Sequence, residues 1–178
     1  MRTPVLALVL SLAIAAPLSA QGFMGDMHGD VNEVQKKFLD LAKAMPDKSY
    51  DWRPGPGVRS VGEVFLHIAG ENYLIPIMMG KAAAAATGIT ADPKSAETFE
   101  KRKLTKAQIV AELEASFKNL HQGMGLTTDA NAGEKIKFFG QDYTRSKTMV
   151  ATVTHLHEHL GQVIAYARSN NVVPPWSK

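Results

Sequence analysis

The chain has 178 residues, a formal net charge of +3 and no cysteine. A chain of this length can form one compact domain with a sizeable hydrophobic core. The absence of cysteine excludes disulfides, thiolate metal ligands and a cysteine nucleophile. Basic residues are spread along the chain and gather only at residues 101–103, so we predict no nucleic-acid surface.

The first 20 residues have the pattern of a secretory signal peptide. Arg2 precedes an apolar stretch from Val5 to Ala16, and small residues ending at Ala20 form a cleavage site. The apolar stretch is shorter than the roughly 20 residues of a transmembrane helix. We therefore expect an exported protein, periplasmic or secreted, that has no membrane association after cleavage. The alternative is an uncleaved N-terminal anchor.

The N-terminal part of the mature chain predicts a lead-in followed by a helix. Residues 21–29 are rich in Gly and Met and show no periodicity, so we expect a flexible segment before a single domain at residues 30–178. Asp30 is a candidate N-cap, and apolar residues then recur at helical spacing as far as Met45. Proline and glycine between residues 46 and 59 exclude a regular element there.

A second helix is predicted from Val61 to about Met79. Ser60 and Glu63 have the spacing of a capping box, in which each side chain bonds a free backbone amide at the helix start. Residues 80–103 are then expected to form a long irregular connection, because Gly88 and Pro93 end any helix that enters it.

A third helix is predicted after Thr105, which forms a second capping box with Gln108. Gly123 and Gly125 are expected to end this helix. The following residues, 126–145, contain turn signals and a short apolar patch that fits either a small strand or a packed loop.

A fourth helix is predicted from about Ser146 to Asn170, where apolar residues form a continuous stripe. Four amphipathic helices without a long strand predict an all-α fold, a four-helix bundle. Metal and cofactor sites in such bundles are built from side chains on facing helices.

The run from His155 to Gln162 carries the strongest chemical signal. His155 and His159 are four residues apart, so a helix places both rings on one face, one turn apart. His157 falls on another side of the helix, and Glu158 faces away. This pair is interpreted either as two metal ligands or as two polar residues on a half-exposed face.

His67, within the second predicted helix, is the candidate for a third ligand. Three neutral imidazoles that leave one coordination position open are typical of a catalytic metal site. His67 could equally be a core histidine bonded to a neighbour. Glu63 and Glu71 lie one turn away on either side, where a carboxylate could orient the ring.

Three segments together resemble the DinB-like superfamily, which includes the YfiT-like thiol transferases. They are residues 52–67, the motif His155-x-x-x-His159-x-Gly161-Gln162, and residues 167–176. The resemblance implies an up-down-down-up four-helix bundle, which accounts for the long connection at residues 80–103. It also implies that His67, His155 and His159 hold a divalent metal, zinc or nickel in known members, and that the protein forms a homodimer, as many members do.

Residue chemistry agrees with these metals, because histidine nitrogens suit zinc, nickel and iron, with manganese as a further candidate. We expect a metal-dependent hydrolase or group transferase, for instance a thiol transferase, that acts on a small molecule. The alternative is a non-catalytic binding module of the cell envelope in which the metal is structural or absent. Candidates for supporting or substrate contacts are Tyr143, Tyr166, Gln162 and Glu63.

Overall fold

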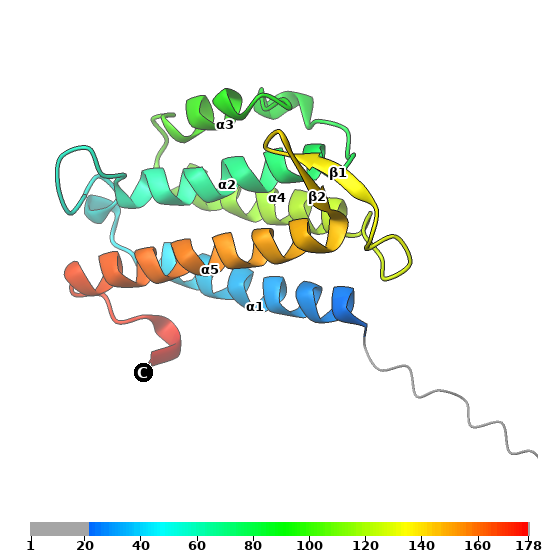
Figure 1. The fold of residues 1–178 in the computed structure, drawn as a ribbon. Coiled ribbons are helices and arrows are strands. Elements are labelled where there is room, and N and C mark those ends of the chain that lie inside the picture. The colour runs from blue at the N-terminus through cyan, green and yellow to red at the C-terminus, as the bar shows by residue number, and fades with distance from the viewer. Residues whose placement is uncertain (1–21, 178) are drawn as a thin grey trace, which may run out of the picture.

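Four long helices form a bundle in the computed structural model, which describes residues 22–177 (Figure 1). The predicted signal peptide lies outside these residues. Within them, no helix combines the length and apolarity needed to cross a membrane. The elements are α1 (Phe23–Ala44), η1 (Asp47–Ser49), α2 (Val61–Met78), η2 (Ala85–Thr87), α3 (Pro93–Glu100), α4 (Lys106–Met124), β1 (Lys135–Phe138), β2 (Gln141–Thr144), α5 (Arg145–Ser169) and η3 (Pro175–Ser177).

The bundle joins its helices in an order that needs one long crossing. Helix α1 packs against α4 and α5, and α2 packs against the same two helices. Figure 1 shows α1 and α5 running in one direction and α2 and α4 in the other, which is the up-down-down-up order expected. Because α2 and α4 are parallel neighbours, the connection between them must return along the whole bundle.

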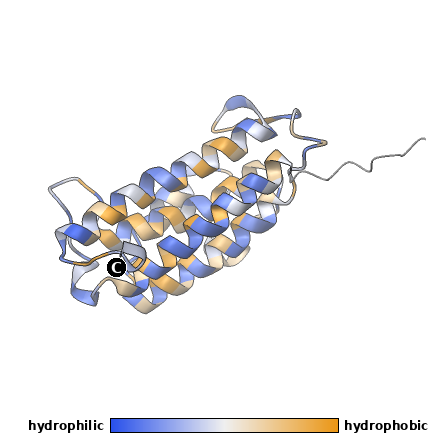
Figure 2. Ribbon diagram, turned by 90° about the horizontal axis from the view of Figure 1, so that it is seen from below, coloured by the Kyte–Doolittle hydropathy of each residue, from blue (hydrophilic) through white to orange (hydrophobic). Residues whose placement is uncertain are grey.

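Apolar residues follow the helices in stripes that meet in one core (Figure 2). The rings of Phe38 on α1 and Phe117 on α4 lie 6.0 Å apart at its centre. Helix α2 is buried on nearly every side, because α3 and β1 cover the face that the bundle leaves open. A helix that is apolar all round needs such a cover.

The predicted flexible lead-in is wrong for residues 23–29, which form the first turns of α1. Met24 is buried, and its backbone N–H donates a hydrogen bond of 3.2 Å to the side chain of Asp129. Asp129 follows Met24 by 105 residues. The helix start is therefore stabilised by a distant loop, and local periodicity gave no sign of it.

The connection between α2 and α4 also differs from the prediction, because it contains the helix α3. Pro93 was expected to end a helix, yet it occupies the first turn of α3. The side chain of Asp92 accepts a hydrogen bond of 3.0 Å from the backbone N–H of Lys94 and caps the start. Proline is favoured at the first helical position, because a backbone N–H there has no hydrogen-bond partner within the helix and its absence costs nothing.

The short apolar patch before α5 forms a strand rather than a packed loop. Strands β1 and β2 pair in antiparallel fashion, with Phe138 opposite Gln141. The two-residue turn between them consists of Phe139 and Gly140, which have φ angles of 46° and 78°. The hairpin lies against α2 and α5, next to the face that carries the histidines.

Candidate metal centre

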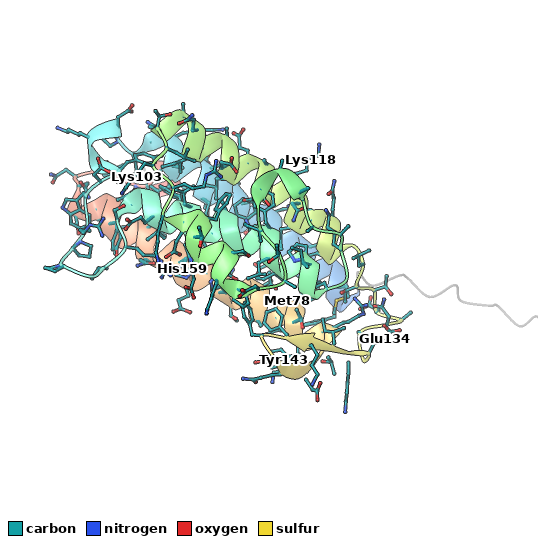
Figure 3. All side chains as sticks on the ribbon, turned by 90° about the horizontal axis from the view of Figure 1, so that it is seen from above. Met78, Lys103, Lys118, Glu134, Tyr143 and His159 are labelled. Carbon is teal, nitrogen blue, oxygen red and sulfur yellow. The ribbon has the colours of Figure 1, made fainter. Side chains whose placement is uncertain are left out.

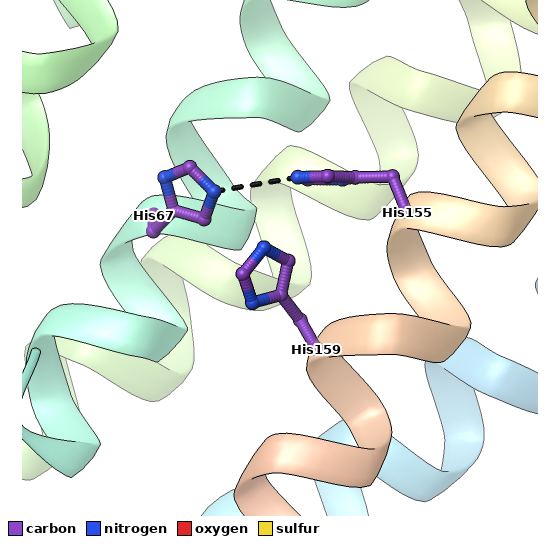
Figure 4. Close-up of side chains that lie close together, drawn as sticks. All are labelled: His67, His155 and His159. Carbon is purple, nitrogen blue, oxygen red and sulfur yellow. Dashed lines mark hydrogen bonds between the residues drawn. The ribbon is translucent and has the colours of Figure 1, made fainter.

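Three histidines meet between α2 and α5, as Figure 4 shows. His67 comes from the middle of α2, while His155 and His159 come from successive turns of α5. One ring nitrogen from each residue lies within 4.8 Å of the other two. The structure thus brings together the three residues singled out in the sequence, hereafter the histidine triad.

The spacing of the triad fits a metal ion. The Nε2 atoms of His67 and His155 are 3.3 Å apart. Two imidazoles bound tetrahedrally to one zinc ion, with Zn–N distances of about 2.0–2.1 Å, hold their nitrogens roughly 3.3 Å apart. Nitrogen donors of this kind suit divalent zinc, nickel and iron. The triad could therefore hold such an ion without rearrangement of its helices.

His67 is oriented by a carboxylate on α3. Its Nδ1 donates a hydrogen bond of 2.9 Å to Oε2 of Glu100, and this leaves Nε2 free as a ligand atom. The same Oε2 accepts a hydrogen bond of 3.1 Å from Nε of Arg59. Burial raises the pKa of Glu100, but the hydrogen bonds from His67 and Arg59 outweigh it and hold the pKa below its usual value. Glu100 is therefore a charged partner for the ring.

His159 is oriented by its own helix. Its Nδ1 donates a hydrogen bond of 2.8 Å to Oε1 of Gln162, and Nε2 of Gln162 donates one of 3.0 Å to the hydroxyl of Tyr166. The Tyr166 ring packs edge-on against Trp52, with centroids 5.3 Å apart. This chain fixes the tautomer of His159 and turns its Nε2 toward the triad.

The triad histidines on α5 are held in the neutral form that metal ligands need. Burial, reinforced by the neighbouring His159 and His67, lowers the pKa of His155 to about 3. Burial is also the main cause that lowers the pKa of His159, and it outweighs the hydrogen bond to Gln162, which raises the pKa. Neutral imidazoles keep their lone pairs available to a cation.

The other sequence candidates have different places. Glu63 does not orient His67; it completes the capping box with Ser60 at 2.8 Å and pairs with Arg53 at 3.2 Å. Figure 3 shows Tyr143 on the hairpin, away from His159. Its ring packs against Phe138 with centroids 5.3 Å apart. Gln162 and Tyr166, by contrast, support the site as predicted, through the hydrogen bonds that orient His159.

His157 lies outside the triad, in agreement with its position on the helix. Its Nε2 is 3.2 Å from Oδ2 of Asp30 on α1, and both side chains are exposed. Sequence reasoning missed Glu100, the residue that holds His67. The sequence Asp92-Pro93 is typical of a helix start and could have indicated α3, whose last turn contains Glu100.

A cavity of about 210 Å³ opens beside the triad, here called the side cavity. Burial raises the pKa of Glu71 on its wall, which favours a protonated carboxyl. A larger hollow of about 380 Å³ lies at the start of α2 and α4, but none of the triad residues lines it. The side cavity is lined by His67, Glu71, Ile75, Phe138, Phe139, Ala151 and His155.

The fold recurs in solved structures of low sequence identity. A DinB-like protein from Bacillus cereus ATCC 10987 is 17% identical, with a TM-score of 0.69 over 87% of this chain and 97% of its own. YfiT from Bacillus subtilis, described as a probable metal-dependent hydrolase with an unusual four-helix bundle topology, is 15% identical, with a TM-score of 0.67 over 88% and 94%. A further DinB-like protein from Bacillus subtilis is 13% identical, with a TM-score of 0.63 over 86% and 99%.

Sequence comparison gives the family directly. No curated protein sequence matched the chain. The model of the DinB superfamily matches residues 31–163, which include α2, α3, the hairpin and all three histidines of the triad. The chain therefore belongs to the DinB superfamily.

Proposed function

We propose that the protein binds one divalent metal ion through the triad and is a metal-dependent hydrolase or group transferase. The observation that carries this proposal is the convergence of three imidazole nitrogens beside an accessible cavity. The description of YfiT as a probable metal-dependent hydrolase supports it. Zinc and nickel are the metals that we expect.

A metal held by His67, His155 and His159 would act as a Lewis acid that could polarise a substrate oxygen or sulfur or lower the pKa of a water molecule. The chain itself supplies the orientation of the ligands. Glu100 and Gln162 each accept a hydrogen bond from Nδ1–H of a triad histidine. The hydrogen bonds from His67 and Arg59 keep Glu100 charged. Glu71 lies on the cavity wall beside His67 and His155, where its carboxyl can exchange a proton with a bound substrate.

The triad can be tested against a matched histidine on the same helix. We expect one equivalent of zinc or nickel per chain, and a loss of affinity of at least about 100-fold in His155→Ala and His159→Ala, because each removes one ligand. His157→Ala should bind metal like the wild type, since His157 pairs with Asp30 outside the triad. Metal analysis and competition with a chelator measure these affinities.

Removal of the metal should abolish any turnover of thiol, ester or amide substrates. Full activity in metal-free protein would exclude the proposal, as would equal metal binding by His155→Ala and His157→Ala. Metal that raises the melting temperature without turnover on any of these substrates would instead indicate a binding module with a structural ion.

A further inference from the structure

The hairpin turn beside the triad places a bulky residue in an unfavourable backbone conformation. Phe139 and Gly140 both have positive φ, as a type I′ turn requires, and Asn-Gly is the favoured sequence there. A large aromatic residue at positive φ is an outlier. Phe139 is also 44% exposed, so burial of its ring does not explain its presence. Such strain is common where a residue serves a binding site.

The hairpin holds this ring in a fixed position. The rings of Phe138 and Phe139 meet edge to face, with centroids 4.8 Å apart. Phe138 packs in turn against Tyr143, and the Tyr143 ring lies under the ammonium group of Lys147 on α5, 3.7 Å from its centroid. The chain of contacts ties the turn to the helix that carries His155 and His159.

Two kinds of side chain line the side cavity. His67, His155 and Glu71 are polar, and Phe138, Phe139, Ile75 and Ala151 are apolar. Its volume of about 210 Å³ exceeds the roughly 150 Å³ of a protein cavity that accepts benzene. The cavity is thus large enough for a phenyl ring or a short branched alkyl chain, and it contains no cationic side chain that would pair with an anionic group.

We propose that the side cavity selects substrates that carry an uncharged apolar group, up to the size of a phenyl ring, next to the polar group that reaches the metal. Phe139 is the specificity-determining residue, with its ring as the outer wall. This inference rests on the proposed metal site, because the triad fixes the polar end of the substrate and the hairpin receives the apolar end.

Two hydroxamates that differ only in this apolar group test the inference on zinc-loaded protein. Both bind metal through the same atoms, but benzohydroxamate adds a phenyl ring where acetohydroxamate has a methyl group. We expect benzohydroxamate to bind at least ~10-fold more tightly by calorimetry, because its ring leaves water for an apolar wall.

Two variants should remove this preference while keeping the metal. Phe139→Asn takes away the ring and suits positive φ, so we expect the melting temperature to stay or to rise by ~2–4 °C. Ala151→Leu fills the cavity from α5. In both, the ratio of the two affinities should fall to within about threefold, because the phenyl ring loses its apolar wall or its space. Leu126→Asn, which replaces an apolar side chain of similar exposure (42%) outside the cavity, should keep the wild-type ratio.

The outcomes separate the cavity from the metal site. Equal affinities for the two hydroxamates in zinc-loaded wild type would overturn the cavity proposal and leave the metal site standing. A preference that persists in both variants would also overturn it, because the ring would then bind elsewhere. Protein that takes up no stoichiometric zinc would refute the proposed function first, and the cavity proposal with it.

Discussion

At the scale of single residues, Glu100 shows how a side chain outside the triad prepares it. Its carboxylate accepts hydrogen bonds from both His67 and Arg59. A carboxylate that accepts a hydrogen bond from Nδ1–H fixes Nε2 as the nitrogen available to a metal and makes that nitrogen more basic. The hydrogen bonds from His67 and Arg59 hold the pKa of this carboxyl below its usual value, and the orientation of the His67 ring does not depend on a bound metal.

Replacing Glu100 should weaken metal binding without removing a ligand. We expect Glu100→Ala to lower the affinity for zinc by ~10–100-fold, which is typical when such a partner is lost. Glu100→Gln should lose less affinity, because its amide oxygen can still accept the hydrogen bond from Nδ1–H of His67. Competition with a chelator of known affinity measures both effects.

The control for this change is Glu114→Gln, which neutralises a carboxylate in an exposed pair with Lys43, at 2.8 Å and remote from the triad. It should bind zinc like the wild type. Wild-type affinity in Glu100→Ala would show that the contact between Glu100 and His67 does not orient the ligand.

The residues of the triad could be predicted from sequence, and their partners only in part. The spacing of His155 and His159 fixes their common face on any helix. Gln162 and Tyr166 follow His159 at helical spacing on the same helix, so their roles could be predicted from sequence. Glu100 reaches His67 across 33 residues, so its role depends on how α3 packs on α2. Periodicity within one helix does not contain that information.

At the scale of elements, the contact between α2 and α4 depends on a glycine. Gly123 was expected to end α4, but the helix continues through it to Met124. A Cβ added at Gly123 would lie 2.4 Å from Cβ and 2.9 Å from Cα of Pro76 in α2. The proline ring is rigid, and the two helices approach this closely only because position 123 has no side chain.

Gly123→Ala should therefore separate these helices. We expect a loss of ~1–3 kcal/mol in the free energy of unfolding, the usual range for overpacking a core, even though alanine has the higher helix propensity. Denaturant unfolding measures the change.

Gly29→Ala is the matched control, because a Cβ at this position of α1 would meet no atom within 4 Å. The substitution should raise stability by up to ~1 kcal/mol through propensity alone. A similar gain from Gly123→Ala would contradict the close packing of Gly123 on Pro76. No gain at Gly29 would indicate that the start of α1 is not helical in solution.

Local sequence predicts where α2 and α4 begin, whereas the starts of α1 and α3 depend on tertiary contacts. Both predicted capping boxes are present, at Ser60 with Glu63 and at Thr105 with Gln108. A capping box is complete within four residues, so it can be recognised in sequence. The start of α1 instead depends on Asp129. A proline such as Pro93 can either end a helix or occupy the first turn of a new one. Only the packing of α3 on α2 shows that Pro93 begins a helix.

At the scale of the whole molecule, the bundle holds a further, half-buried histidine whose pKa is lowered. Nε2 of His121 on α4 donates a hydrogen bond of 2.7 Å to Oε1 of Gln35 on α1. The His121 ring also stacks on His28, with centroids 6.4 Å apart. Burial, and next the charge of His28, lower the pKa of His121 below 6.5. The unfolded chain therefore takes up a proton at this residue at a higher pH than the folded protein does.

This difference makes folding depend on pH. The contribution of His121 to stability is complete above its unfolded pKa of 6.5 and declines as the pH falls below that value. In chelator-treated protein, we expect the free energy of unfolding to decrease between pH 7 and pH 5, with a shallower decrease in His121→Gln. The triad histidines contribute equally to both proteins and cancel in the comparison. Parallel curves would show that His121 titrates alike in the folded and unfolded states.

His67 and His155 are separated by 88 positions in the sequence, so a metal ion that bound both would also act as a cross-link on the unfolded chain. An ion held by both would close a loop of that length in a protein that has no cysteine. By the entropy estimate used for disulfides, a covalent loop of this size destabilises the unfolded ensemble by on the order of 4–5 kcal/mol. A metal would thus serve as a reversible cross-link between the second helix and the C-terminal one, and it could form only after α5 has docked.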